Sequence, residues 1–222
     1  MPSSPVEKGF GQGDPALERW ADGVYHPEDA VLREIRERSV REGLPLIAVG
    51  RFDGLHLEVL ARAAGASKAV EIGTLGGYSG VCLLRGMGPH GVLHTFEYSE
   101  KHARVANESF HKAGVAARAH IHVGAALDRL PEIEAEAPFD LVFVDADKVS
   151  YPAYLAWAAD HLREGGVLLA DNAFGFGEIH LPGGDEGRLA LRKFNEQLAQ
   201  GGRFRATMIP TAEGLAMGVK VR

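Results

Sequence analysis

The sequence predicts an α/β fold in which a doubly wound, mostly parallel sheet is covered by helices on both faces. Between residues 68 and 171, five short apolar segments alternate with helical patterns, as expected of parallel strands joined by crossover helices. Several of these segments are almost continuously apolar, which is typical of strands buried on both faces. Two further strand patterns near the C-terminus are separated by a short turn and predict an antiparallel hairpin.

The strands and helices of this core are expected in a regular order. The five core strands are expected at 68–73, 91–97, 118–123, 139–145 and 166–171. The helices are expected at about 77–87, 99–113, 125–131, 150–163 and 186–200. The hairpin strands are expected at 203–210 and 214–221, joined by the turn sequence TAEG.

The N-terminal part predicts helices that precede the sheet. One begins at Asp14-Pro15, which offers an N-cap followed by proline at the first helical position. A second begins near Pro27, and a third runs over about 53–64. Residues 1–13 are rich in Gly, Pro and Ser and are expected to be loose. Because no linker divides the chain, one domain is expected over 1–222, with N-terminal helices at 14–66 and an α/β core at 67–222.

Composition excludes several classes of protein. The 222 residues carry a formal net charge of -6, which disfavours binding to nucleic acid. The single cysteine, Cys82, cannot form an internal disulfide, which favours a reducing cytoplasm. No secretory signal is recognisable at the N-terminus. No apolar stretch approaches the roughly 18 residues of a membrane span, so we expect a soluble cytoplasmic protein.

A glycine-rich turn follows the first core strand. It contains Gly73, Gly76 and Gly77, a spacing that does not fit the G-x-G-x-x-G pattern of dinucleotide-binding proteins and so disfavours a dehydrogenase. The turn lies where ligands bind in open α/β sheets, although it could also be an ordinary tight turn. Glu97 ends the next strand, where a carboxylate accepts ribose hydroxyls; the alternative is an exposed loop acid.

Acidic residues also end the fourth and fifth core strands. Asp145 follows FDLVFV, and Asp171-Asn172 follows GVLLA. If the two strands are neighbours, these side chains converge and offer hard oxygen ligands for Mg²⁺, Mn²⁺ or Ca²⁺. The alternative is that the acids are helix caps or loop residues. Lys148, three residues after Asp145, is either a general base for a metal-bound hydroxyl or a solvated surface lysine.

Together these segments resemble the metal-dependent O-methyltransferases of the catechol and caffeoyl-CoA type. The matching segments are VEIGTLGGYSG, HTFEYSEKHARVA, HVGAALDRLP, FDLVFVDADKVSYPAYL and LREGGVLLADN. The resemblance covers about residues 45–222 and is strongest in VDADK and LLADN. It implies a class I S-adenosylmethionine (SAM) fold, which is Rossmann-like and has a seven-stranded sheet with the last strand antiparallel.

The resemblance also implies roles for individual residues. Glu71, Gly73, Thr74 and Ser79 would line the amino-acid end of SAM, with Glu97 at the ribose and Ala126 by the adenine. Asp145, Asp147 and Tyr154 match further positions of the SAM pocket, and Val49 matches a position that touches the cofactor. Asp145, Asp171 and Asn172 would bind the metal, and Lys148 would be the general base.

The implied function is transfer of the SAM methyl group to a metal-bound hydroxyl of a small phenolic, catechol-like acceptor, with Mg²⁺ as the expected metal. The alternatives are a metal-independent SAM methyltransferase acting on another hydroxyl or an amine, and a non-catalytic SAM-binding module. One departure concerns the Trp-Asn pair that follows the metal ligands in plant caffeoyl-CoA enzymes. Here the chain reads Ala173-Phe174-Gly175-Phe176, which argues against a CoA ester. The two Phe belong either to a lid over residues 173–187 or to the core. The resemblance also implies a homodimer.

Overall fold

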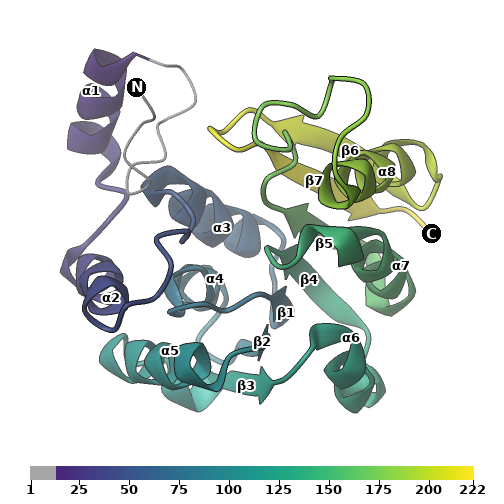
Figure 1. Cartoon of the computed structure of the whole chain (residues 1–222). Helices are drawn as coiled ribbons and strands as arrows, with labels where there is room; N and C mark the ends of the chain where they lie inside the picture. Colours follow the sequence, from purple (N-terminus) through teal and green to yellow (C-terminus); the bar gives the residue numbers. More distant parts are fainter. Residues whose placement is uncertain (1–13) are drawn as a thin grey trace.

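The computed structural model describes residues 14–222 and confirms the predicted fold class (Figure 1). Within these residues the sheet has seven strands in the order β3-β2-β1-β4-β5-β7-β6. The first five strands are parallel, and β7 pairs antiparallel with both β5 and β6. The strands are β1 (Lys68–Ile72), β2 (Val92–Glu97), β3 (Ala119–Val123), β4 (Phe139–Val144), β5 (Leu162–Ala170), β6 (Phe204–Ile209) and β7 (Leu215–Lys220). The expectation for residues 1–13 lies outside the described residues.

Helices flank this sheet and precede it. The α-helices are α1 (Pro15–Tyr25), α2 (Ala30–Arg41), α3 (Arg51–Ala63), α4 (Tyr78–Gly86), α5 (Glu100–Lys112), α6 (Ala126–Arg129), α7 (Tyr151–His161) and α8 (Glu186–Gln200). Three short 3-10 helices are η1 (Ala116–Arg118), η2 (Leu130–Glu136) and η3 (Lys148–Ser150). Every helix of the described part is too short or too polar to traverse a lipid bilayer.

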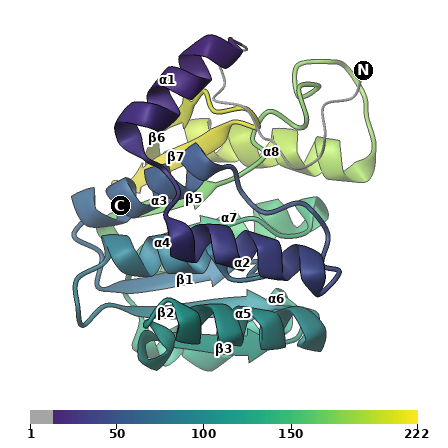
Figure 2. The ribbon, with the colours of Figure 1, turned by 90° about the vertical axis from the view of Figure 1, so that its left-hand side faces the viewer.

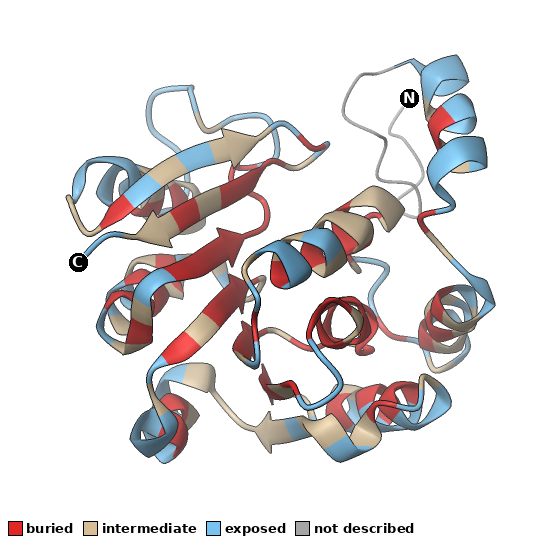
Figure 3. Cartoon of the chain, turned by 180° about the vertical axis from the view of Figure 1, so that it is seen from behind, coloured by how far each residue is buried: buried red, intermediate tan, exposed pale blue. Residues whose placement is uncertain are grey.

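Two hydrophobic cores lie on opposite faces of the sheet (Figure 3). Because successive strand residues point to opposite faces, β1 sends Ala69 to the core under α3, α4 and α5 and Val70 to the core under α7 and α8. In the same way, β4 divides Phe143 and Val144 between the two cores. Burial on both faces explains why the core strands are almost continuously apolar.

The N-terminal helices begin close to their predicted positions. Asp14 caps α1 by accepting a hydrogen bond from the Ala16 N–H at 2.8 Å, as the sequence predicts. Helix α2 begins at Ala30 rather than near Pro27, because Asp29 is its N-cap. Helix α2 packs against α4 and α5, whereas α1 projects away from the α/β core (Figure 2). The expected N-terminal helical region is therefore present.

Two elements of the α/β core also differ from the sequence-based expectation. Strand β5 begins at Leu162 instead of residue 166, because an irregular register pairs Phe139 with Leu162 before regular pairing resumes between Leu141 and Val167. The predicted helix at 125–131 ends at Arg129 and continues as the 3-10 helix η2. Pro131 has no N–H for an α-helical hydrogen bond, which accounts for the change of helix type.

Candidate active site

A cavity of about 1140 Å³ opens at the carboxyl ends of the parallel strands. This volume is large enough for a cofactor together with a small molecule. Residues 46–49, the turn after β1 and the segments that follow β2, β3, β4 and β5 all contribute to its wall. The predicted site residues that line it are Val49, Gly73, Thr74, Ser79, Glu97, Ala126, Asp145, Asp147, Lys148, Tyr154 and Asn172. The structure thus brings together eleven of the predicted residues, whereas Glu71 and Asp171 lie behind the wall, 0% and 1% exposed.

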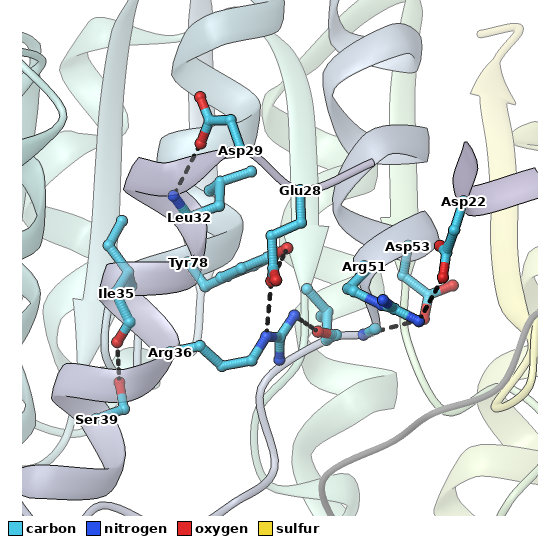
Figure 4. A network of polar contacts seen from close by, with 12 residues as sticks. Asp22, Glu28, Asp29, Leu32, Ile35, Arg36, Ser39, Arg51, Asp53 and Tyr78 are labelled. Atoms are coloured by element: carbon cyan, nitrogen blue, oxygen red, sulfur yellow. Dashed lines mark hydrogen bonds and ion pairs between the residues drawn. The ribbon is translucent and has the colours of Figure 1, made fainter. Parts of the chain in front are cut away.

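Arg36 of α2 holds the segment that carries Val49 (Figure 4). Its Nη2 donates to the Val49 carbonyl oxygen at 3.0 Å, and its Nε donates to Glu28 Oε1 at 2.9 Å. The guanidinium carbon lies 4.1 Å from the centre of the Tyr78 ring, and the Tyr78 hydroxyl donates to the same Glu28 oxygen at 3.1 Å. Arg36 therefore uses its charge to fix the cavity wall.

The turn after β1 brings the ends of three strands together. Gly73 has φ +102°, a conformation that residues with a side chain rarely adopt. Its N–H donates to the Phe96 carbonyl at 3.0 Å, and a Cβ at this position would overlap the carbonyl oxygen of Asp145. Glycine is therefore needed here for the close approach of β1, β2 and β4, which shapes the floor of the cavity.

Glu97 is buried and held by several hydrogen bonds, so the alternative of an exposed loop acid is wrong. Its Oε2 accepts from the Leu75 N–H at 2.8 Å, and its Oε1 accepts from the Ser99 N–H at 2.9 Å. His102 Nδ1 lies 3.3 Å from the same Oε1. The carboxylate therefore links the glycine-rich turn to the start of α5 while it faces the cavity.

Glu71 lies under the same turn, fully shielded from solvent. Ser79 Oγ and Thr95 Oγ1 each donate to its carboxylate at 2.6 Å, and Thr74 Oγ1 lies 2.5 Å from Thr95 Oγ1. Burial raises the pKa of Glu71 to about 7, and the carboxylate of Asp145 adds to this rise, whereas the two hydroxyl donors oppose it. Glu71 therefore supports the cavity wall through Ser79 and Thr74.

Strands β4 and β5 are parallel neighbours, as the interpretation of the acids required. Val144 pairs with Ala170, so Asp145 and Asp171 follow paired residues at the same edge of the sheet. The Asp171 N–H donates to the Val144 carbonyl at 3.0 Å, which fixes this register up to the acids. Adjacent strands lie about 4.8 Å apart, so the two acids start from neighbouring backbone positions.

The donor set at this edge fits a hard divalent cation. Two carboxylates and an amide oxygen are ligands that Mg²⁺, Mn²⁺ and Ca²⁺ prefer. Asn172 is buried, and its backbone has φ 61°, an uncommon conformation that is frequent at functional sites. Its side chain faces the cavity and makes no hydrogen bond to another residue within 14–222. The Lys148 ammonium, 3.1 Å from Asp145 Oδ1, shows that a positive charge is accommodated beside this carboxylate.

Lys148 is half-buried at the cavity wall rather than solvated on the surface. Its Nζ also donates to the Tyr151 hydroxyl at 2.8 Å. Tyr151 is fully buried, and its hydroxyl donates to the carbonyl oxygens of Asp171 at 3.1 Å and Val144 at 3.3 Å. Burial holds the pKa of Tyr151 well above its usual value, and the carboxylates of Asp145 and Asp171 contribute to the rise. The phenol therefore stays protonated and ties Lys148 to the ends of β4 and β5.

Tyr151 is a site residue that the sequence-based prediction missed. It lies three residues after Lys148, a spacing that places two side chains on the same side of a helical turn. That spacing was the available signal, but it does not reveal which of the nearby polar groups the phenol reaches.

Asp147 and Tyr154 form a second pair at the wall. The Tyr154 hydroxyl donates to Asp147 Oδ1 at 2.7 Å, and the Ser150 N–H donates to Asp147 Oδ2 at 3.1 Å. Burial raises the pKa of Tyr154, and its bond to Asp147 raises it further, so this phenol is a hydrogen-bond donor at neutral pH. Asp147 also caps η3, so it serves a local structural role beside its place in the cavity.

Phe174 and Phe176, in the loop after β5, were expected to belong either to a lid or to the core. The structure gives the two residues different environments. The Phe174 ring lies against Gly214, where it leaves no room for a Cβ. Phe176, in contrast, is 68% exposed and lines the cavity. Phe174 therefore packs inward and anchors the loop, whereas Phe176 presents an apolar ring to a ligand in the cavity.

Comparisons with known proteins agree with this geometry. A model of the O-methyltransferase family matches residues 22–221. A catechol O-methyltransferase of Mycobacterium tuberculosis is 40% identical over 197 residues, which is 89% of this chain and 89% of that protein. A catechol O-methyltransferase of Niastella koreensis is 33% identical over 212 residues, which is 92% of this chain and 96% of that protein.

Solved structures show the same fold. An O-methyltransferase of Bacillus cereus in complex with S-adenosylhomocysteine (SAH) superposes with a TM-score of 0.87 at 36% identity, covering 92% of this chain and 97% of that one. An O-methyltransferase of Streptomyces achromogenes involved in tomaymycin synthesis, in complex with SAM, has a TM-score of 0.87 at 34% identity. The superposition covers 93% of this chain and 96% of that one.

The raised pKa of Glu71 predicts a pH-dependent stability in the ligand-free protein. A carboxyl group with a higher pKa in the folded state stabilises the fold when protonated. Its contribution is full below the ordinary value of 4.5 and is lost as the pH rises to about 7. The loss from this group is on the order of 3 kcal/mol. We expect Glu71→Gln, which cannot ionise, to gain stability relative to the native protein as the pH rises through this window.

Urea unfolding between about pH 4 and pH 8 measures this difference. Glu164→Gln, a change at an exposed position of β5, is the matched control and should follow the native curve. Parallel curves for Glu71→Gln and the native protein would contradict the expected titration of Glu71.

Proposed function

The chain belongs to the SAM-dependent O-methyltransferase family, and we propose that it methylates a hydroxyl of a small, catechol-like phenolic acceptor at a divalent metal site. The observation that carries this proposal is the register of β4 and β5, in which Val144 pairs with Ala170, so that Asp145 and the segment Asp171-Asn172 follow paired residues at one edge of the sheet. The relatives named catechol O-methyltransferase support the acceptor class.

SAM supplies the methyl group, and we propose that it binds in the cavity at the carboxyl ends of the strands. We propose that Glu97 accepts the ribose hydroxyls, since a carboxylate accepts two such donors well. The turn at Gly73 and Thr74, supported from below by Glu71 through Ser79, lines the amino-acid end. Ala126, at the start of α6, would lie by the adenine.

Asp145, Asp171 and Asn172 would hold Mg²⁺, and the same ligands suit Mn²⁺ or Ca²⁺. Such a cation supplies Lewis acidity, which stabilises negative charge on the acceptor oxygen. Two neighbouring hydroxyls would give a catechol two points of attachment there and fix its orientation. Correct orientation of the reacting atoms accounts for much of the rate in transfers of this kind.

Lys148, in its neutral form, is the proposed general base for the acceptor hydroxyl. As the oxygen forms its bond to the methyl carbon, the carbon–sulfur bond breaks, its electron pair stays on sulfur, and SAH is left. The hydroxyl proton ends on Lys148 Nζ. Tyr151 holds this nitrogen near Asp145, so a buried side chain orients the proposed base.

A metal-independent transfer is the second candidate, and one observation favours it. Lys148 already pairs with Asp145 at 3.1 Å, so the lysine could itself neutralise the carboxylate. The acids would then serve only the cofactor and the acceptor. The two mechanisms differ in their response to chelation.

The remaining expectations about the protein's surroundings stay predictions. The homodimer rests on the family resemblance, and the cytoplasmic location rests on the single cysteine. The absence of a nucleic-acid partner is supported by the formal net charge of -6.

Removal of divalent metal is expected to abolish methyl transfer. EDTA should lower the turnover of 4-methylcatechol by roughly 100-fold or more, and added Mg²⁺ should restore it. Asp145→Asn, which keeps the size but loses the charge, should lose activity in the same way and respond weakly to Mg²⁺. Calorimetric titration should still detect SAM binding to both samples.

The exposed Asp160→Ala variant is the control and should keep native turnover. Turnover that is unchanged by EDTA would select the metal-independent mechanism. Loss of SAM binding together with activity would show that Asp145 acts through the cofactor.

Tyr151→Phe is expected to act through Lys148. Removal of the phenol oxygen should lower kcat by roughly tenfold while KM for SAM stays near native, because Lys148 loses the group that orients it. Lys148→Met should lower kcat by roughly a thousandfold. In the Lys148→Met background, Tyr151→Phe should have no further effect.

Tyr25→Phe, on the exposed face of α1, is the matched control. Independent, multiplicative effects of the two changes at Lys148 and Tyr151 would rule out this coupling.

A further inference from the structure

Three histidines lie together where β2 meets β3, away from the cavity. In the parallel register His94 pairs with His120, and two residues further on Phe96 pairs with His122. Because side chains two positions apart share a face of a sheet, the four rings lie on one side. The His94 ring stacks on His120 and on His122, with 5.2 Å and 5.3 Å between ring centres. None of the three histidines takes part in the proposed methyl transfer.

His94 and His122 form the centre of a hydrogen-bonded chain between two carboxylates. His94 Nδ1 lies 3.0 Å from His122 Nε2. The other nitrogen of each ring faces an acid of η2. His94 Nε2 lies 3.1 Å from Glu136 Oε2, and His122 Nδ1 lies 3.5 Å from Glu132 Oε2. Each ring is therefore placed between the other ring and one carboxylate.

The number of protons in this chain is limited by its geometry. The chain has three contacts, and each contact needs one N–H. A neutral imidazole carries a single N–H, so two neutral rings supply two. One added proton supplies the third and satisfies every contact. A second added proton finds no acceptor, because it would set two N–H groups face to face at 3.0 Å. The pair therefore accommodates one extra proton but not two.

Several other charged or titratable groups surround the pair. They are His120 of β3, Glu132 and Glu136 of η2, Arg129 of α6 and Lys68 of β1. Arg129 Nη1 lies 2.7 Å from Glu132 Oε1, and Lys68 Nζ donates to the Glu136 carbonyl oxygen at 2.5 Å. From β4, His94 meets only the uncharged ring of Phe139 among the described residues. The two acids are thus shared with other cations and compensate only part of a double positive charge.

Burial holds the pKa of His94 and the pKa of His122 below their ordinary value of 6.5. The carboxylates of Glu136 and Glu132 oppose this fall, whereas the neighbouring imidazoles add to it. A histidine whose pKa is lower in the folded state stabilises the fold at high pH, and this contribution is lost as the pH falls below 6.5. Acid therefore charges the pair and weakens the packing around it.

The pair adjoins the wall of the cavity. The His122 ring stacks on Phe96, with 4.7 Å between ring centres, and Phe96 lines the cavity. Two residues after His122, the Gly124 N–H donates to the Glu97 carbonyl oxygen at 2.9 Å. Gly124 and Ala126 also line the cavity. Among the described residues β3 is an edge strand of the sheet (Figure 1), so His122 moves more easily than His94, which lies on an inner strand.

We propose that His94 and His122 form an acid-sensitive switch that weakens cofactor binding when both rings are protonated. The second proton separates His122 from His94, and β3 then carries the wall segment around Ala126 away from the cavity. The switch is a property beyond the proposed reaction, but its effect on binding rests on the proposed SAM site.

NMR spectra of the histidine side chains test the shared proton in the full chain. Long-range proton–nitrogen spectra between about pH 8 and pH 4.5, without ligand, follow each ring nitrogen. His94 and His122 should titrate together in two steps, both below pH 6.5, because each proton belongs to the pair. The exposed His90 should titrate in a single step. Two independent single-step curves for His94 and His122 would contradict the switch.

Calorimetric titration with SAH tests the link to the cavity. The Kd of the native protein should be weaker at pH 5 than at pH 7.5 by roughly fivefold or more. His122→Phe keeps a ring against Phe96 but binds no proton, so it should lose most of this change. His90→Gln is the matched control and should keep the native change. Other titrating groups, such as Glu71, are present in all three proteins, so the difference reports on the pair.

Glu132→Gln is a second variant, on an exposed residue that the fold does not depend on. Loss of this carboxylate makes the charged pair less stable, so the loss of SAH affinity should move to lower pH by up to roughly half a unit. Glu134→Gln, in the same 3-10 helix but bonded to Trp157, is its control and should leave the midpoint unchanged. A midpoint that stays or rises in Glu132→Gln would count against the switch.

The outcomes separate this inference from the proposed function. If SAH binds and His122→Phe keeps the native pH dependence, the switch is wrong and the proposed function stands. If SAH does not bind the native protein at pH 7.5, the proposed SAM site fails and the switch fails with it.

Discussion

The parallel pairing of β4 with β5 is the constraint on which the site depends. Val144 pairs with Ala170, so two acids that are 26 positions apart in the chain leave the sheet side by side. The hydrogen bond from the Asp171 N–H to Val144 carries this pairing one residue beyond the strands. A shift of one residue would turn one acid toward the opposite face of the sheet. The apolar runs that bury both strands therefore also fix the geometry of the acids.

A second buried carboxylate joins the cavity wall to the sheet. Glu71 is shielded from water, where a charge is costly, yet two hydroxyl donors hold it. Ser79 lies in the first turn of α4 and Thr95 belongs to β2, so the Glu71 side chain ties together β1, β2 and α4. A rigid floor of this kind keeps the cavity formed before any ligand arrives, which reduces the ordering cost of binding.

Much of the fold could be predicted because burial leaves a clear pattern. The continuous apolar strands, the terminal hairpin and the acids at the strand ends are all visible in the sequence and are present in the structure. The start of β5 at Leu162 was not predictable, because the segment LREGG has no strand pattern and joins the sheet only through an irregular register with β4.

The identity of the site residues was more predictable than their burial. Sequence position identifies Asp171 as a strand-end acid, and the family resemblance identifies Glu71. Only the packing shows that both lie behind the cavity wall. The contacts of Tyr151 depend on where α7 packs, which is a tertiary property that spacing along the chain does not encode.

The proposed convergence of Asp145, Asp171 and Asn172 around one cation can be tested directly. Crystals grown with SAH and Mn²⁺ would give an anomalous difference peak for the metal. The account predicts one peak within about 2.3 Å of an oxygen from each of the three side chains, with Lys148 displaced from Asp145. A peak elsewhere, or none while Lys148 remains bound to Asp145, would contradict it.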